Sequence, residues 1–136
     1  FNQLLDEYGA SQPDRIRVSV SLGQVNYSSA MRHCAAVVGN SSSGLVEAPA
    51  LCRPTVNIGD RQAGRLMATS VVSCVATREA ITTAIGAVLS QEFQQRLPET
   101  QSLYGLGHTA AFIKEQLKMA ELTGVVKRFY EGPVAS

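Results

Sequence analysis

Residues 35–58 read AAVVGNSSSGLVEAPALCRPTVNI, and this stretch decides the fold. Two short apolar runs, 35–38 and 54–58, have the composition of strands that are buried on both faces of a parallel sheet. The residues between them suit a short helix over 45–51, with Glu47 in its first turn. The stretch therefore predicts a strand, a helix and a second strand, in that order.

The alternation of strands and helices continues toward the amino end. Residues 15–21 read RIRVSVS, in which apolar and polar residues alternate with the period of two that predicts a strand. Residues 27–34 show near-helical spacing of their apolar members, and Asn26 or Ser28 could cap that helix. The chain begins at Phe1 inside a further helical pattern, so we expect it to be a piece of a longer protein.

The same alternation continues toward the carboxyl end. Residues 71–76 read VVSCVA and predict a third buried strand. Thr77 then caps a helix that carries Glu79 in its first turn. Further helical segments are expected at 91–97, at 109–117 and, as a basic amphipathic tail, at 122–130.

This order of elements indicates an α/β fold with a parallel sheet. In such sheets, ligands bind beyond the carboxyl ends of the strands. Chemistry is therefore expected in the loops that follow Val20, Val38 and Ile58.

The composition of the chain limits the classes of protein to which it can belong. The chain has 136 residues, of which 45% are hydrophobic and 17% charged, with a formal net charge of +1. We expect one packed domain over 1–136, with no nucleic-acid or membrane partner, because the net charge is close to zero. Cys34, Cys52 and Cys74 are odd in number and lie in apolar runs, which favours free thiols in a reducing compartment, the cytoplasm. No pattern predicts a metal ion or a cofactor.

The loop after the strand at 35–38 has the composition of a phosphate cradle. Residues 39–49 read GNSSSGLVEAP, which leaves a strand and opens a helix. Small residues, free N–H groups and hydroxyls gather here at a helix N-terminus, whose partial positive charge favours anions. We call residues 40–44 the serine turn. The alternative interpretation is that Ser42 or Ser43 only caps the helix.

The loop after the strand at 54–58 is basic. Residues 59–65 read GDRQAGR, and we call them the arginine loop. Arg61 and Arg65 suit a phosphate or carboxylate that is bound bidentately. The alternative is a solvated loop with an internal pair between Asp60 and an arginine.

The two loops follow successive strands, so they can converge at one edge of the sheet. Glu47 lies in the helix after the serine turn. It could accept hydrogen bonds from ribose hydroxyls, or it could only interact with the helix dipole. A cradle, an acid and a basic loop together favour a site for a nucleoside diphosphate.

The segment GNSSSGLVEAPALCRPTVNIGDRQAGR, residues 39–65, closely resembles the UDP-N-acetylglucosamine 2-epimerase family, above all its UDP-hydrolysing branch. The stretches SLGQVNYSSAMRHC before it and YGLGHTAAFIKEQL after it also have counterparts in that family. The resemblance implies a Rossmann-like three-layer domain that forms one half of a GT-B arrangement, two such domains facing across a cleft. This chain would be the carboxyl-terminal, UDP-holding domain. The catalytic carboxylates would belong to an amino-terminal domain outside this chain, so no catalytic residue is assigned.

The resemblance also implies roles by position. Ser41 and Ser42 would donate to the diphosphate, Glu47 would bind the ribose, and Arg61 would help to close the nucleotide site. The full set of expected ligand-binding residues is Leu22, Tyr27, Asn40, Ser41, Ser42, Ser43, Gly44, Glu47, Arg61, Gln62 and Arg65.

The loop after the first expected strand would line the uracil pocket, Leu22 through its backbone and Tyr27 through its ring. The alternative for Tyr27 is an aromatic residue of the core. His33 is interpreted as structural. Leu106, close to His108, stands where the family often has an aspartate, which weakens any polar role of that loop.

The reaction that the resemblance implies eliminates UDP across C1–C2 of the sugar nucleotide and then adds water. The product would be N-acetylmannosamine or a related free sugar, used in making sialic acids. The ligand would be UDP or UDP-N-acetylhexosamine, and this chain alone would be inactive. Two alternatives stay open, a UDP-sugar-binding module without catalysis and the donor half of a GT-B glycosyltransferase. The tail at 122–130 could also pair with a second copy of the chain, as a homo-oligomer.

Overall fold

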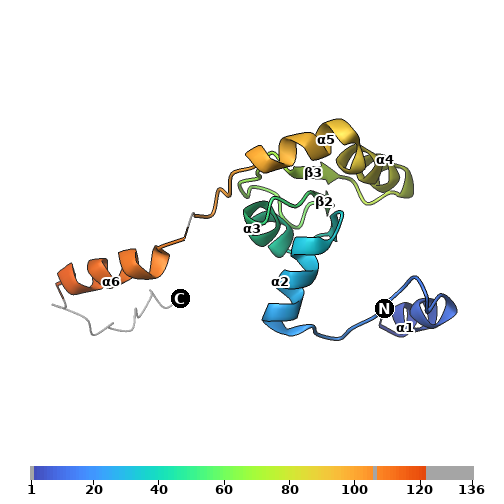
Figure 1. Cartoon of the computed structure of the whole chain (residues 1–136), viewed down its shortest axis with the longest axis horizontal. Helices are drawn as coiled ribbons and strands as arrows, with labels where there is room; N and C mark the ends of the chain where they lie inside the picture. Colours follow the sequence, from blue (N-terminus) through green and yellow to red (C-terminus); the bar gives the residue numbers. More distant parts are fainter. Residues whose placement is uncertain (1, 106, 122–136) are drawn as a thin grey trace, which may run out of the picture. The chain divides into compact units, whose positions relative to one another are not determined.

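The computed structural model describes residues 2–105 and 107–121 (Figure 1). Its contacts group the chain into two compact units, Phe1–Tyr104 and Gly105–Ser136. The second unit contains one described helix, α6 (Thr109–Met119). The first unit contains, in chain order, α1 (Asn2–Ser11), α2 (Gly23–His33), β1 (Val37–Gly39), α3 (Ser43–Ala50), β2 (Thr55–Ile58), β3 (Val71–Cys74), α4 (Arg78–Leu89), α5 (Gln91–Arg96) and the 3-10 helix η1 (Leu97–Glu99).

The three strands form one parallel sheet in the order β1-β2-β3. Val37 of β1 is paired with Thr55 of β2, and Val56 of β2 with Val72 of β3. The expected alternation of short strands with helices is therefore confirmed, and the sheet is the parallel, Rossmann-like one that this alternation predicts.

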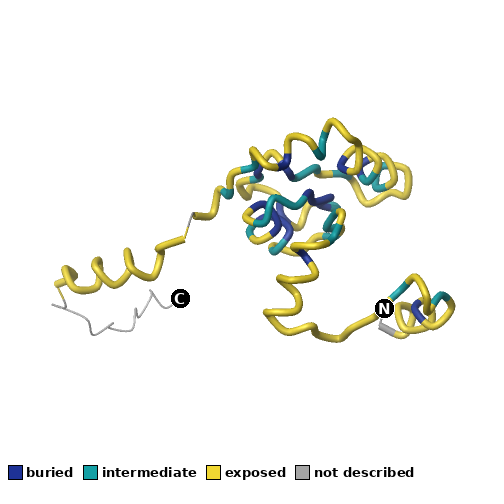
Figure 2. Tube along the Cα trace, viewed as in Figure 1, coloured by how far each residue is buried: buried dark blue, intermediate teal, exposed yellow. Residues whose placement is uncertain are grey.

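Helices cover both faces of this sheet. Val56 points to one face, where it packs with Ala84 and Val88 of α4 in the buried core. Thr55 points to the opposite face, where its hydroxyl donates to the carbonyl of Gly44 in α3 at 2.8 Å. Figure 1 shows α3 on one side of the strands and α4 with α5 on the other. Figure 2 shows the buried residues concentrated where these three layers meet. The three-layer architecture is thus confirmed.

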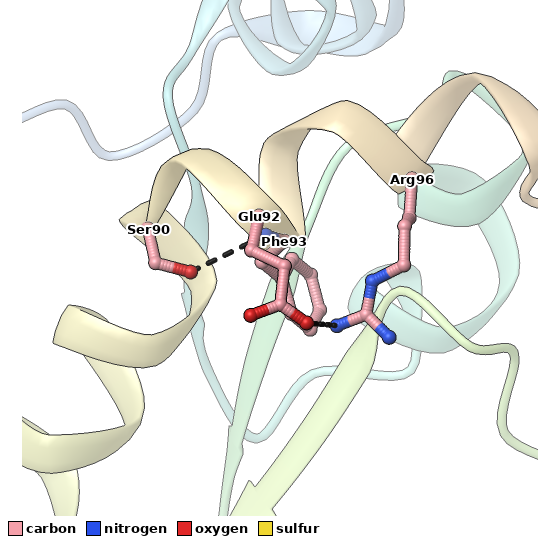
Figure 3. Close-up of polar contacts among 4 residues, drawn as sticks. All are labelled: Ser90, Glu92, Phe93 and Arg96. Carbon is pink, nitrogen blue, oxygen red and sulfur yellow. Dashed lines mark hydrogen bonds and ion pairs between the residues drawn. The ribbon is translucent and has the colours of Figure 1, made fainter.

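Two of the helices begin with hydroxyl caps. Thr77 accepts a hydrogen bond from the backbone N–H of Ala80 at 3.3 Å, as the sequence predicts for α4. Ser90 does the same for Phe93 at the start of α5 (Figure 3). Within α5, Arg96 lies 3.9 Å from Glu92 and 5.5 Å from the centre of the Phe93 ring.

The predicted strand at 15–21 is wrong. These residues form a turn followed by extended chain outside the sheet, and Val20 is fully exposed. Period-two alternation gives a segment the side-chain pattern of a strand, but a strand also needs a neighbour for its backbone groups. This segment pairs with none of the three strands of the described sheet.

Three finer expectations are also corrected. β1 is an edge strand with Val38 47% exposed, so it is not buried on both faces. α2 begins at Gly23, before Asn26 and Ser28, and its N-cap residue is Leu22, so neither expected residue caps it. α3 begins at Ser43, which places Glu47 in the second turn and not the first.

The helical tail expected at 122–130 lies outside the described residues, and so do Leu106 and Phe1.

Gly44 allows α3 to approach β2 closely, which leads to a test. A Cβ atom at Gly44 would lie 2.8 Å from Cγ2 of Thr55, a side chain that is 2% exposed and hydrogen-bonded to Gly44. We expect Gly44→Ala to lower the free energy of unfolding by about 1–3 kcal/mol, measured by urea denaturation.

Gly86, in the last turn of α4, is the matched control. Nothing lies within 4 Å of a Cβ atom built there. Gly86→Ala should therefore raise stability by about 0.5–1 kcal/mol through backbone entropy alone. A Gly44→Ala variant as stable as the unmodified chain would contradict the close packing of α3 on β2.

Candidate functional site

The serine turn and the arginine loop meet at the carboxyl end of the sheet. The serine turn follows β1, and the arginine loop follows β2, the strand paired with it. The side chain of Gln62 donates from Nε2 to the carbonyl of Asn40 at 2.7 Å, which joins the two loops directly. Gln62 is 3% exposed and Asn40 is exposed, so this bond runs from the interior to the surface of the protein.

The serine turn presents hydroxyl groups at the start of α3. Ser42 occupies the N-cap position, but its side chain makes no capping hydrogen bond, so the interpretation of Ser42 as a simple cap is wrong. Its carbonyl instead accepts from the N–H groups of Leu45 and Val46, both at 3.0 Å. Ser41 and Ser42 are both exposed. Their hydroxyls therefore stand at a helix N-terminus, where the partial positive charge favours an anion.

Tyr27 secures the serine turn from the side of α2. Its hydroxyl lies 2.6 Å from Oγ of Ser43, and that Oγ lies 3.3 Å from Oγ of Ser41. Tyr27 is located in the second turn of α2 and not in the preceding loop. It is 38% exposed, so the alternative of a core aromatic residue is wrong. Ser43 and Ser41 thus already have hydrogen-bond partners, which leaves Ser42 as the hydroxyl of the turn that has no hydrogen bond to a described residue.

Beside the serine turn lies a shallow surface pocket between α2 and α3. Leu22, Tyr27 and Glu47, which the sequence assigns to one nucleoside, all line it. Glu47 is exposed on α3. The remaining lining residues are Ser21, Gly23, Gln24 and Ser28. An apolar side chain, an aromatic ring and an acid thus share one pocket whose mouth is open to solvent.

The arginine loop is held at both ends and has exposed cations. The N–H of Gly59 donates to the carbonyl of Cys74 at 2.8 Å, which fixes the start of the loop on β3. Arg61 and Arg65 are exposed. Ion pairs within residues 2–105 and 107–121 involve only helical side chains, so the alternative of an internal pair between Asp60 and an arginine is wrong. The guanidinium groups are free to bind an anion.

Sequence reasoning missed one residue of this region. The hydroxyl of Tyr104 donates to the carbonyl of Leu66 at 2.9 Å and fixes the chain just beyond the arginine loop. Nothing in the sequence predicts this contact, because Tyr104 is far from Leu66 along the chain. The side chain of Gln62, which the sequence assigns to the ligand, is buried and donates to the carbonyl of Asn40.

His33 lies apart from these loops, in the last turn of α2. Nδ1 of His33 lies 3.1 Å from the carbonyl of Ser29 in the same helix, which fits a structural role. Within the described ranges, no cluster of three His, Cys, Asp or Glu side chains has the geometry of a metal site. None of the helices described is long and apolar enough to cross a membrane.

Comparison with known proteins gives two kinds of match. The family described as UDP-N-acetylglucosamine 2-epimerase matches residues 1–118. The polysialic acid biosynthesis protein P7 of Escherichia coli is 30% identical over 123 residues, which are 88% of this chain and 31% of that protein. The GDP/UDP-N,N'-diacetylbacillosamine 2-epimerase (hydrolyzing) of Campylobacter jejuni is 38% identical over 72 residues, 53% of this chain and 19% of that protein. The chain thus spans less than a third of the length of either relative.

The bond between Tyr27 and Ser43 can be tested without removing the aromatic ring. Tyr27→Phe deletes only the hydroxyl, which lies 2.6 Å from Oγ of Ser43. We expect the free energy of unfolding in urea to fall by about 0.5–1.5 kcal/mol. Tyr8→Phe in α1 is the control, because the hydroxyl of Tyr8 has no hydrogen bond to any described residue. Equal stability of the two variants would show that Tyr27 does not secure the serine turn.

Proposed function

This chain belongs to the UDP-N-acetylglucosamine 2-epimerase family, and from that premise we propose that it is the UDP-binding domain of a hydrolysing 2-epimerase. The observation that carries the proposal is the meeting of the serine turn and the arginine loop at one edge of the sheet, beside the pocket at Glu47. One domain over 1–136 would hold the nucleotide. A second domain, outside this chain, would supply the catalytic acid and base.

The diphosphate would lie between the serine turn and the arginine loop. Ser41 and Ser42 would donate their hydroxyls, and the N-terminus of α3 would add its partial positive charge. Arg61 and Arg65 would neutralise the phosphate oxygens from the other side with charge-assisted hydrogen bonds. Exposed arginines that form no ion pair with a described residue are suited to this task, because binding an anion does not first require such a pair to break.

The uridine would occupy the pocket between α2 and α3. Glu47 would accept hydrogen bonds from the ribose hydroxyls, since an ionised carboxylate is an acceptor only and ribose offers two donors. The ring of Tyr27 would contact the uracil while its hydroxyl remains bound to Ser43. The backbone of Leu22, just before α2, would contact the base edge.

These contacts would serve the departure of UDP from the sugar. Elimination across C1–C2 places negative charge on the β-phosphate as the C1–O bond breaks, and donors already aimed at the diphosphate stabilise that charge. Proton removal at C2 needs a base. The carboxylates for that step would belong to the second domain, so this chain alone should bind UDP without turnover.

Relatives support the hydrolysing branch. One of them is named a hydrolysing 2-epimerase, and the other is named for polysialic acid biosynthesis. We propose a UDP-N-acetylhexosamine as the substrate and N-acetylmannosamine or a related free sugar as the product. We place the protein in the cytoplasm, because its odd number of cysteines, none spaced as C-x-x-C, suits a reducing compartment.

Calorimetry with UDP tests the diphosphate half of the site. Arg61→Ala and Ser42→Ala should each weaken binding by about 1.5–3 kcal/mol, or roughly 10- to 150-fold in Kd, because each removes a hydrogen bond to a charged group. Arg32→Ala is the control, since Arg32 lies in the last turn of α2, roughly 13 Å along the helix from its first residue. Equal UDP binding by Arg61→Ala and the unmodified chain would contradict the proposed site.

Glu47→Gln tests the nucleoside half separately. We expect it to weaken uridine and UDP by similar factors, about tenfold, since it replaces an ionised acceptor of the ribose hydroxyls. Arg61→Ala should leave uridine binding unchanged, because uridine has no phosphate. Both affinities can be measured by NMR titration. If Glu47→Gln weakened UDP but not uridine, the ribose would not lie at Glu47.

A further inference from the structure

Gln62 differs from its neighbours in the arginine loop. Asp60, Arg61 and Arg65 are exposed, whereas Gln62 is 3% exposed and is directed into the protein. Its Nε2 donates to the carbonyl of Asn40, the first residue of the serine turn, at 2.7 Å. The one inward side chain of this loop is thus the one that links it to the serine turn.

The chemistry of Gln62 is unfavourable for a residue that only fills space. Its Oε1 is buried and has no hydrogen-bond partner among the described residues. Burying an unpaired carbonyl oxygen costs stability, and an apolar side chain of similar size would avoid that cost. What an apolar side chain could not do is donate to the carbonyl of Asn40. The donor group is therefore the property that a glutamine adds here.

The bond to Asn40 holds the whole arginine loop and not only one side chain. The loop is folded on itself by two turns, in which Ala63 donates to Asp60 at 2.8 Å and Arg65 donates to Gln62 at 3.2 Å. Gly59 and Leu66 fix the two ends on other parts of the unit. Among the described side chains, Gln62 makes the hydrogen bond that joins this folded loop to the serine turn.

We propose that Gln62 is a positioning residue, which holds the arginine loop against the serine turn and so sets the separation between Arg61 and the hydroxyls of Ser41 and Ser42. The bond joins the two loops through protein groups alone, so the fold itself holds the two halves of the proposed anion site in place. The identity of that anion, the diphosphate of UDP, rests on the proposed function. Gln62 itself would not contact the ligand.

The test uses Gln62→Met, which keeps an unbranched side chain of similar length but has no donor. We expect the Kd for UDP to rise by about tenfold, because Arg61 and the serine hydroxyls no longer share one fixed geometry. The Kd for uridine should change by less than about twofold, since the pocket at Glu47 does not depend on the arginine loop. Gln95→Met, at an exposed position of α5, is the matched control and should change neither value.

A second measurement needs no ligand. Amide hydrogen exchange of the free chain should become faster in residues 60–65 and 40–44 of Gln62→Met, while the amides of β2 and α4 stay protected. Gln62→Glu should show the larger change, because its carboxylate places an acceptor against the carbonyl of Asn40.

The outcomes separate the two proposals. If the unmodified chain bound neither UDP nor uridine, the proposed function would fail, and the exchange rates would still decide whether Gln62 holds the loop. Equal weakening of UDP and uridine in Gln62→Met would overturn the positioning role, because it would indicate a general loss of structure. Unchanged exchange in both loops of Gln62→Met would overturn it as well.

Discussion

Parallel pairing of β1 with β2 is the constraint on which the rest of the structure depends. Two parallel neighbours must leave the sheet at the same edge, so the loops that follow them are brought together whatever their own sequences are. Here those loops carry three serines and two arginines. The meeting of these two loops is thus a consequence of topology first and of side chains second.

The close approach of α3 to β2 fixes the orientation of α3 on the sheet. Gly44 brings the first turn of the helix against Thr55. The hydroxyl of Thr55 donates a hydrogen bond to the carbonyl of Gly44, which fixes the helix on the strand. Because the helix is seated there, its N-terminus opens at the carboxyl end of the sheet. Gly44 therefore serves the packing of α3 on β2. Tyr27 and Gln62 then secure the serine turn from two sides, one through Ser43 and the other through Asn40.

The site divides into an apolar, acidic half and a cationic half. Leu22, Tyr27 and Glu47 share a pocket between two helices, whereas Arg61 and Arg65 lie on a loop. Such a division suits a ligand with a nucleoside at one end and phosphates at the other. It also agrees with the membership of this chain in a family of sugar-nucleotide epimerases.

The sequence alone determined the local features, because these depend on neighbours along the chain. The strands at β1, β2 and β3, the Thr77 cap and the polar loops could be predicted from apolar runs, turn residues and hydroxyl positions. Only the tertiary structure decided which polar side chains are exposed and can contact a ligand. Gln62 and Arg61 are adjacent in the chain, yet one is buried and the other exposed. Residues 15–21 have the pattern of a strand but no neighbour to pair with. Burial and pairing are set by contacts with distant residues, and a single sequence does not specify where those residues lie.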